Sequence, residues 1–532
     1  MRTTRNEALR ILRALLLAAL AAAIVAPQGG GARAQEEPDA KPRGEKPRGR
    51  DGKGRGREAR EIALPVPEGT WNVASVIVAR PGATTVDLNV LALKPVRGRV
   101  EYWKAGTSDI RRTEERAFAV GDPAVVRISG LAPDTSYGYR LAVVREGEEG
   151  TVAGPEWSFQ TQRARGKAFV FEVQGDSHPE RPHQNDPPLY AATLRAASAD
   201  RPDLYFAIGD DFSVDTLREV TPEAVDAIYL GQRRTLALVG HSAPLFLVNG
   251  NHEQASLANL DGTPGSVAVL AQNRREKYFS QPAPEGIYTG NVEPVPHVGL
   301  LRNTFSFRWG DALFVVIDPY WHTPVPVDNA RGTREKGARD LWTVTLGEKQ
   351  YRWLRETLAT SDAPFKFVFA HHVNGTGRGG VELAPFYEWG GRNRDGSRGF
   401  EAKRPGWELP IHDLMAKYGV TVFFQGHDHV FCRQQLGGVV YQTLPLPADP
   451  SSTLYNREAY RSGEALPGPG RVRVKVTADK AVVEYVRTPV GKDATSARPD
   501  AEVAFSYTLT PRLTGGSSRL AAPQLPAPAG SR

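Results

Sequence analysis

The stretch "VFFQGHDHVFCR" (422–433) is the best guide to the fold of this chain. The short run "VFFQ" stops at a glycine, and two histidines one residue apart follow it. A brief apolar run without polar alternation is typical of a strand that is buried on both faces. The polar residues behind it could form an ordinary turn or a metal site, and the rest of the sequence has to decide between these interpretations.

Five further runs between residues 168 and 372 have the same form. Each is short, nearly continuous in apolar residues and closed by polar residues: "AFVFEVQGD", "DLYFAIGD", "APLFLVNGNHE", "ALFVVIDP" and "FKFVFAHH". Helix-like stretches such as "EKQYRWLRETLAT" (348–360) lie between several of them. Strands that alternate with helices predict an α/β domain, here over residues 164–511.

Potential metal ligands gather at the ends of these runs, where ligands bind in open α/β sheets. Six of the 11 histidines are among them. Imidazole, carboxylate and amide groups without a thiolate suit Mn, Fe or Zn. Their number exceeds what one tetrahedral ion needs, which favours two ions that share a carboxylate. The candidates are Asp176 and His178, Asp210, Asn251 and His252, His371 and His372, and His427 and His429.

A different pattern precedes the α/β domain. Over residues 64–163, short runs rich in Val, Leu and aromatic residues alternate with Gly, Pro and Asp, which predicts an antiparallel β-sandwich. The segment "LAPDTSYGYRL" (131–141) resembles the L-x-P-x-T-x-Y-x-Y corner of fibronectin type III modules, with Tyr137 in the corner position. We therefore expect a multidomain chain, with a fibronectin III-like β-sandwich in front of the α/β domain.

The ordered motifs GD-x-H, GD, GNHE, H and GH-x-H, between residues 175 and 429, resemble those of the calcineurin-like metallophosphoesterase superfamily. The sandwich in front resembles the architecture of purple acid phosphatases and their bacterial relatives. The resemblance implies two packed mixed β-sheets flanked by helices. It also implies hydrolysis of phosphate esters, above all phosphomonoesters, by attack of metal-bound hydroxide. Two divalent or trivalent ions (Fe, Mn or Zn) and a small phosphorylated substrate would be the partners.

Carried over position by position, the resemblance gives a role to each of eight residues. Asp210 would bridge both ions. His252 would contact the phosphate and protonate the leaving oxygen. Each ion would have three further ligands: Asp176, His178 and His429 for one, and Asn251, His371 and His427 for the other.

Neighbouring residues have weaker assignments. Glu253 could orient a histidine, and His372 could support the ligands or lie in a plain loop. Asp211 and Asp215 could face the metals, although acids after a strand are more often solvated or cap the next helix. Asp428, between the two histidines of GHDH, receives no role.

Some departures from the related families narrow the prediction. Purple acid phosphatases have a tyrosine three residues after the bridging aspartate, where this chain has Ser213, and a glycine where it has His178. Their colour comes from charge transfer between that tyrosinate and ferric iron, so we expect a colourless enzyme. "HHVN" (371–374) replaces the "HHPP" of many phosphodiesterases of the superfamily, which leaves the ester class open.

Two alternatives remain beside a phosphomonoesterase. A phosphodiesterase or nuclease would use the same ligands. A surface binding protein with a degenerate phosphatase domain should have lost ligands, and all eight expected positions are present here. The sequence does not indicate an oligomeric state.

The first 34 residues have the pattern of a secretory signal peptide. Basic residues precede the apolar run "ALLLAALAAAIVA" (14–26), and small residues follow at 32–34. The run is shorter than the roughly 20 apolar residues of a membrane-spanning helix. We therefore expect a periplasmic or secreted protein with no transmembrane segment after cleavage. Residues 35–63 are predicted to be a disordered, charged, Gly/Pro-rich linker, and residues 512–532 a disordered tail.

The net charge of +7 does not indicate a nucleic-acid-binding protein. Residues 1–62 carry 14 Lys and Arg against 8 Asp and Glu, so most of the excess lies outside the predicted folded part. Because binding to phosphate backbones needs a basic face, long nucleic acids are disfavoured as substrates. The single cysteine, Cys432, allows no internal disulfide and is expected to be buried like a small apolar residue.

Overall fold

The computed structural model describes residues 71–327, 340–373, 377–490 and 502–512, except for residues 146, 148 and 452. The predicted signal peptide, the linker and residues 513–532 of the predicted tail lie outside these ranges. Within the described ranges, none of the helices has both the length and the apolar character that crossing a membrane requires.

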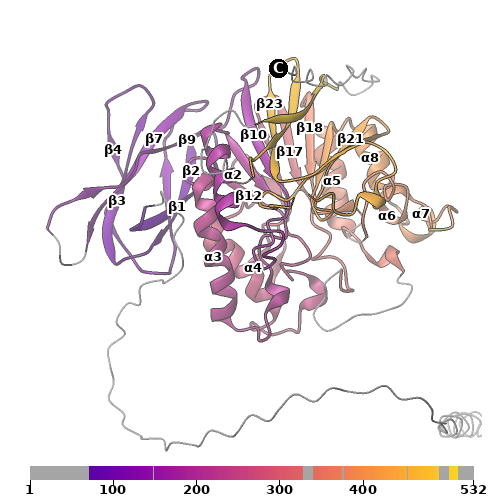
Figure 1. The fold of residues 1–532 in the computed structure, drawn as a ribbon, viewed down its shortest axis with the longest axis horizontal. Coiled ribbons are helices and arrows are strands. Elements are labelled where there is room, and N and C mark those ends of the chain that lie inside the picture. The colour runs from indigo at the N-terminus through magenta and orange to yellow at the C-terminus, as the bar shows by residue number, and fades with distance from the viewer. Residues whose placement is uncertain are drawn as a thin grey trace, which may run out of the picture. The chain divides into compact units, whose positions relative to one another are not determined.

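The N-terminal part of the described chain is a β-sandwich, drawn in indigo and violet in Figure 1. Its strands are β1 (Ala74–Ala79), β2 (Thr85–Ala92), β3 (Val96–Lys104), β4 (Arg111–Arg112), β5 (Arg116–Phe118), β6 (Ala124–Ser129), β7 (Ser136–Arg145), β8 (Val152–Ala153) and β9 (Trp157–Gln160). One sheet has the order β1-β2-β6, and β3 and β7 form the centre of the other. The hydroxyl of Tyr137 accepts a hydrogen bond from the backbone N–H of Ala132 (2.8 Å), the contact that a tyrosine corner makes.

Two mixed sheets form the centre of the following domain. The first has the order β12-β11-β10-β23-β24-β25, and the second has the order β13-β16-β17-β18-β19-β21-β20-β22. The strands of the first sheet are β10 (Phe169–Gln174), β11 (Leu204–Ala207), β12 (Leu245–Leu247), β23 (Gly470–Val476), β24 (Ala481–Arg487) and β25 (Val503–Leu509). Those of the second are β13 (Thr289–Gly290), β16 (Phe305–Trp309), β17 (Ala312–Val316), β18 (Phe365–Phe369), β19 (Val422–Gln425), β20 (Phe431–Leu436), β21 (Val439–Thr443) and β22 (Glu464–Leu466). A separate pair consists of β14 (Pro294–Val295) and β15 (Gly299–Leu300).

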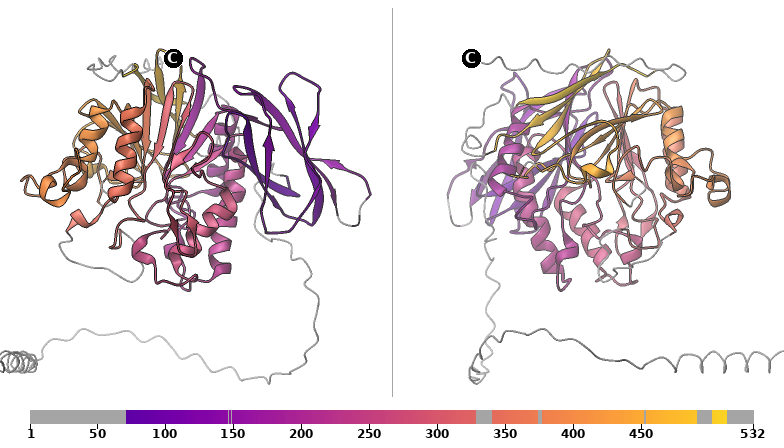
Figure 2. Two further views of the ribbon diagram at one scale, coloured as in Figure 1. Left: turned by 180° about the vertical axis from the view of Figure 1, so that it is seen from behind. Right: turned by 45° about the vertical axis from the view of Figure 1, so that its right-hand side comes forward.

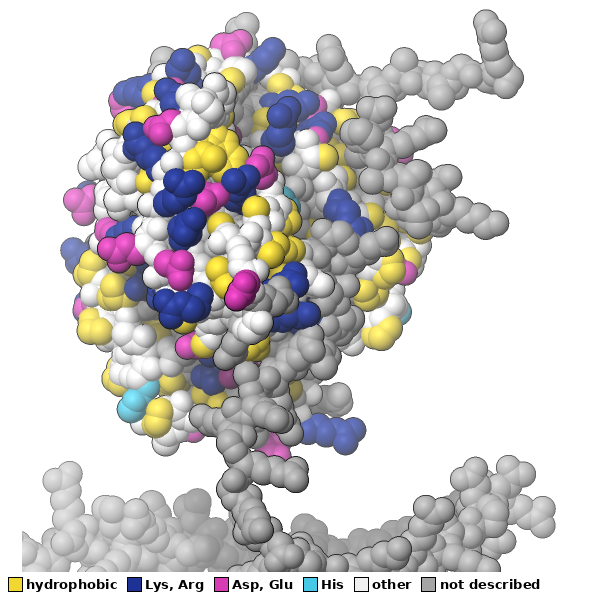
Figure 3. Space-filling model, turned by 90° about the vertical axis from the view of Figure 1, so that its left-hand side faces the viewer, with side chains coloured by type: hydrophobic (Ala, Val, Ile, Leu, Met, Phe, Trp, Pro, Cys, Tyr) yellow, Lys and Arg dark blue, Asp and Glu magenta, His cyan; other side chains and the backbone are white. Residues whose placement is uncertain are grey.

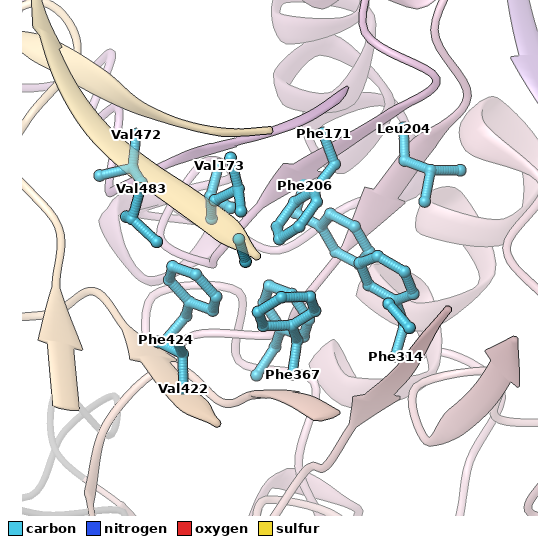
Figure 4. Packing of buried hydrophobic residues seen from close by; sticks show 14 of the residues in the cluster. Phe171, Val173, Leu204, Phe206, Phe314, Phe367, Val422, Phe424, Val472 and Val483 are labelled. Carbon is cyan, nitrogen blue, oxygen red and sulfur yellow. The ribbon is translucent and has the colours of Figure 1, made fainter. Parts of the chain in front are cut away.

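The inner faces of the two sheets meet in a core of phenylalanine and valine side chains (Figure 4). Phe171 of the first sheet packs on Phe367 of the second, with ring centroids 4.9 Å apart. Phe206 stacks on Phe369 at 4.3 Å. The alternate residues of β11, such as Tyr205, face the helices instead and are also buried. The predicted strands buried on both faces are thereby confirmed.

Helices cover the outer faces of both sheets (Figure 2). On the first sheet lie α2 (Pro187–Ala199), α3 (Pro222–Gly240) and α4 (Val267–Phe279), and on the second lie α5 (Glu348–Thr360) and α8 (Ile411–Lys417). The helices α2 and α3 each begin with proline after a capping side chain, Asp186 and Thr221 respectively. The shorter elements are α6 (Tyr387–Gly390), α7 (Phe400–Lys403) and the 3₁₀ turns η1 (Val214–Thr216), η2 (Leu257–Asn259), η3 (Leu341–Thr343) and η5 (Arg457–Ala459).

The sandwich contacts the α/β domain through α3. The guanidinium of Arg233 is fully buried and donates to the side chain of Asn89 (2.8 Å) and to the backbone carbonyls of Asn89 (2.7 Å), Ser75 (3.0 Å) and Tyr278. Tyr139 adds a bond from its hydroxyl to the carbonyl of His241 (2.6 Å). On the face shown in Figure 3, basic and acidic side chains are interspersed. Within the sandwich, Arg112 and Arg140 both pair with the buried Glu101.

Candidate metal centre

The first group of predicted ligands consists of Asp176, His178 and His429. Asp176 and His178 follow β10, and His429 follows β19. Nε2 of His429 lies 3.1 Å from Oδ2 of Asp176 and 3.0 Å from Nε2 of His178. All three side chains are buried, and each offers a ligand atom within 4.8 Å of the others. This spacing suits a single ion.

The second group forms beside the first. Nε2 of His371, which follows β18, lies 3.1 Å from Oδ2 of Asp210 and 3.2 Å from Oδ1 of Asn251. Asp210, His371 and His427 also offer ligand atoms within 4.8 Å of one another. Nδ1 of His371 is 2.9 Å from the carbonyl of Ile208, and this contact orients the ring.

Asp210 lies between the two groups. The same oxygen, Oδ2, that is near His371 in the second group is 3.8 Å from Nε2 of His178 in the first. The other oxygen, Oδ1, accepts the backbone N–H of His252 (2.9 Å), which fixes the carboxylate. The structure thus brings all seven predicted ligands together and places Asp210 where a bridging carboxylate would be.

The backbone around the ligands is adapted to this arrangement. Cβ atoms built on Gly426 and Gly250 would lie 2.3 Å from Oδ1 of Asp176 and 2.2 Å from Oδ1 of Asp210, so only glycine leaves room for the carboxylates. Four predicted ligands have positive φ angles: His178 (41°), Asp210 (58°), His427 (66°) and His429 (60°). Each such non-glycine residue costs about 1–3 kcal/mol and tends to occur at functional sites. The glycine cradles and the nitrogen and oxygen donors fit two ions of the Mn, Fe or Zn class.

The charges of the site require compensating positive charge. Burial would raise the pKa of Asp176 and Asp210, but the nearby histidines, His371 foremost, hold both well below their ordinary range. Burial would lower the pKa of His371, but Asp210 and Asp176 raise it to about 10. Hydrogen bonds to Asp176 and Glu180 likewise outweigh burial and raise the pKa of His178 to about 9. Protonated histidines thus supply the positive charge that bound metal cations would otherwise supply.

His252 lies at the edge of the two groups. Its Nε2 is 3.8 Å from Oδ2 of Asp210, and its Nδ1 is 2.9 Å from Oδ2 of Asp215. Burial lowers the pKa of His252, but Asp210 and Asp215 outweigh burial and raise it. Asp215 is therefore partly buried against His252 and does not cap a helix, because η1 turns it back onto the GNHE loop, where its N–H also reaches the His252 carbonyl (3.3 Å).

Glu253 supports the loops that carry Asp210 and Asn251. Its carboxylate accepts four backbone N–H groups, from Asp210 (3.1 Å), Asp211 (2.9 Å), Phe212 (3.1 Å) and Gly250 (2.7 Å). The loops after β11 and β12 cross at this point and present their amides to this carboxylate. Burial and Asp210 raise the pKa of Glu253 to about 7.

Asp211 and His372 lie on different sides of the centre. Asp211 is buried and accepts a hydrogen bond from the amide of Gln174 (2.9 Å), so its carboxyl group faces the end of β10 and is shielded from solvent. His372 lies against the ring of His427, with centroids 4.4 Å apart, and its Nδ1 is 3.1 Å from the hydroxyl of Tyr320. His372 is thus placed to hold a predicted ligand.

Asp428 and Cys432 have structural surroundings. Asp428 accepts the backbone N–H of Gly379 (2.7 Å) and the hydroxyl of Tyr460 (2.5 Å), which tie neighbouring loops to GHDH. Cys432 is buried, and burial raises the pKa of its thiol to about 12. A thiol with so high a pKa is a poor nucleophile near neutral pH.

Glu180 and Arg181 were not singled out by the sequence prediction. Oε1 of Glu180 is 2.9 Å from Nδ1 of His178, and Nη2 of Arg181 is 2.7 Å from Nε2 of His252. The only signal in the sequence is that the two residues follow the GDSH motif after one proline.

Comparisons with known proteins agree with this geometry. The family model described as Calcineurin-like phosphoesterase matches residues 172–431, which include all seven predicted ligands and His252. A comparison with curated protein sequences finds no match.

Two solved structures share the fold over most of the chain. One is PhoD, with a TM-score of 0.59 and 14% identity over 84% of this chain and 92% of that one. The other is the purple acid phosphatase PPD1 from yellow lupin (Lupinus luteus) seeds, with a TM-score of 0.50 and 16% identity over 82% of this chain and 74% of that one. Residues 172–431 therefore form a calcineurin-like phosphoesterase domain, and the predicted resemblance to metal-dependent phosphoesterases is confirmed.

Proposed function

We propose that the protein is an exported phosphoesterase that hydrolyses phosphate esters, above all phosphomonoesters, at a centre of two metal ions. The observation that carries this proposal is the pair of adjacent ligand groups that share Asp210. Two ions of Fe, Mn or Zn would be held by these side chains: Asp176, His178 and His429 for one, Asn251, His371 and His427 for the other, and Asp210 for both. When bound, such ions supply a water-derived nucleophile near neutral pH and Lewis acidity at phosphorus.

His252 is proposed to act on the leaving group. As the water-derived oxygen bonds to phosphorus, the bond from phosphorus to the ester oxygen breaks and its electron pair stays on that oxygen. Nε2 of His252 would then donate the proton that makes it a neutral alcohol. Asp215, 2.9 Å from Nδ1, holds the ring in the orientation that this transfer needs.

A metal analysis combined with a phosphate-release screen tests the proposal. The purified protein should contain two metal ions per chain and should hydrolyse an aryl phosphate faster than a bis-aryl phosphate, both followed by release of the aryl alcohol, and faster than a phosphoanhydride, followed by release of phosphate. Full activity with a single ion would contradict the dinuclear centre. Absence of hydrolysis in all three substrate classes, with both ions bound, would leave only a binding function.

We also propose that residues 1–34 direct export and are removed. The support is the basic and apolar pattern of these residues. N-terminal sequencing of protein recovered outside the cytoplasm should begin at Gln35.

The domain limits proposed here remain 64–163 for the sandwich and 164–511 for the catalytic domain, and β9 and β10 lie on either side of the boundary between them.

A further inference from the structure

Arg181 is a cationic side chain that reaches the metal centre without belonging to the ligand set. Its Nη2 lies 2.7 Å from Nε2 of His252. The ring of His252 in turn lies against that of the predicted ligand His178, with ring centroids 4.8 Å apart. The guanidinium therefore lies near both the proposed proton donor and the first ligand group, and about a quarter of the side chain (27%) remains exposed to solvent.

The loop between β10 and α2 holds Arg181 in this position. The backbone N–H of Arg181 donates to the carbonyl of His178 (3.0 Å), and its own carbonyl accepts from Gln184 (2.8 Å) and Asn185 (2.9 Å). The side chain is held by Oε1 of Glu180, 3.1 Å from Nε, and by Oε1 of Gln184, 3.2 Å from Nη1. A guanidinium fixed on two sides is prepared to bind an anion with little loss of side-chain entropy.

Glu180 connects this arginine to the centre. The same oxygen, Oε1, is 2.9 Å from Nδ1 of His178 and 3.1 Å from Nε of Arg181. The position of the guanidinium is therefore tied to the position of a proposed ligand. A substrate phosphate bound by Arg181 would therefore have a fixed position relative to the proposed metal ligands.

The contact between Arg181 and His252 is weaker than the contact that a phosphate oxygen would offer the guanidinium. An arginine can only donate hydrogen bonds, and here Nη2 donates to a histidine nitrogen, a weaker partner for it than a phosphate oxygen, which adds negative charge. A phosphate oxygen between Arg181 and His252 would give Nη2 a charged acceptor, as Glu180 already gives Nε one, and would leave Nε2 of His252 free to carry the proton that it is proposed to donate.

We propose that Arg181 binds a terminal oxygen of the substrate and selects phosphomonoesters over diesters. This inference rests on the proposed function. A monoester has three terminal oxygens and a charge of about −2 near neutral pH, whereas a diester has two terminal oxygens and a single charge. If two terminal oxygens were taken up at the metal centre, only the monoester would keep a third for Arg181. Only two of the seven proposed ligands, Asp176 and Asp210, are anionic, so the loaded centre would be cationic and would also favour the more highly charged ester.

A purely structural role for Arg181 makes a different prediction. If Arg181 only positioned His252, its loss would impair protonation of the leaving oxygen in monoesters and diesters alike. Turnover of both classes would then fall in parallel. Selection through a third oxygen affects the monoester alone, so the ratio of the two activities separates the roles.

The test compares Arg181→Gln and Arg181→Lys with the unmodified full-length, metal-loaded protein. For Arg181→Gln, kcat/KM on an aryl phosphate should fall by about 100-fold, and that on a bis-aryl phosphate should change by less than about 3-fold. Arg181→Lys keeps the charge but loses the planar fork, so its loss on the monoester should be intermediate. In Arg218→Gln, which alters an exposed arginine on the loop after η1, both activities should be unchanged.

A binding measurement provides a second readout. Calorimetry with inorganic phosphate should show at least about 10-fold weaker binding to Arg181→Gln, whereas the content of both metals should stay unchanged. Parallel losses on both ester classes, or phosphate binding as tight as in the unmodified protein, would overturn the assignment of Arg181. If the unmodified protein itself hydrolysed neither ester, the proposed function would fail instead, so the two failures are distinguishable.

Discussion

The metal centre and the contact between the sandwich and α3 both bury charged side chains, but they compensate for them in different ways. Arg233 is surrounded by neutral acceptors, three backbone carbonyls and the amide of Asn89, and burial lowers its pKa to about 9. Asp176 and Asp210 face histidine nitrogens. The negative charge of these two carboxylates is balanced only when the histidines are protonated or when a metal ion takes the place of their protons. The acceptors of the first region all come from the polypeptide, whereas the second would be completed by a cation.

The difference shows what each region is built for. Buried charge costs several kcal/mol unless hydrogen bonds or an opposite charge offset the lost hydration. At α3 the chain meets this cost with its own backbone, so the contact contributes to holding two domains together. At the strand ends, the cost of burying the two carboxylates would be offset by a metal ion. Four of the proposed ligands there also have strained backbone conformations. Four predictions test this contrast, from the largest expected effect to the smallest.

Asp210→Asn should have the largest effect, because the carboxylate lies between both ligand groups. Turnover of an aryl phosphate should fall by about 10⁴-fold or more, since both ions lose a charged ligand. Steady-state kinetics and elemental analysis of the same sample measure the change. Near-normal turnover with an unchanged metal content would show that the centre does not depend on this bridge.

Gly426→Ala should weaken metal binding without altering any ligand. The added Cβ would lie 2.3 Å from Oδ1 of Asp176, so the carboxylate has to move. We expect affinity for the metals to fall by about 10- to 100-fold, measured by competition with a chelator. Gly231→Ala is the matched control, because a Cβ at this position meets no atom within 4 Å. Gly231 lies in α3, where alanine should stabilise the helix by up to about 1 kcal/mol. Equal metal affinity in both variants would refute the cradle.

Arg233→Met should affect stability and leave the chemistry intact. The substitution leaves the carbonyls of Ser75, Asn89 and Tyr278 without their buried donor, which costs about 3 kcal/mol of unfolding free energy. Denaturant unfolding measures the loss, and kcat on an aryl phosphate at low temperature should stay within about twofold. A large fall in kcat with unchanged stability would mean that the two regions are coupled.

The smallest effect concerns pH and the metal-free protein. His178 and His371 have pKa values of about 9 and about 10, above the ordinary value of 6.5. Their stabilising contribution is therefore complete below about pH 6.5 and is lost as pH rises through these raised values. After chelation, the midpoint of thermal unfolding should fall by about 5 °C between about pH 7 and pH 10. The metal-loaded protein, whose ligating histidines are neutral, should show less change, and equal pH dependence in the two forms would contradict this.

The fold and the proposed ligands could be predicted because their signal is local. A buried strand is visible in the sequence as an apolar run. A residue that directly follows the run, such as His371 or His427, must lie at the edge of the sheet where the strand ends. Contacts between loops carry no such signal. Asp215 meets His252 because η1 reverses the chain, and Glu253 meets backbone amides because two loops cross. Arg181 depends on the turn that its own backbone makes.

Glu253 also bears on which ions the site accepts. Its four backbone hydrogen bonds join the loop of Asp210 to the loop of Asn251, so folding itself sets the separation of these two side chains. A frame joined in this way should resist contraction around a small ion and expansion around a large one. Discrimination by ionic radius should therefore come from a residue that does not touch the ion.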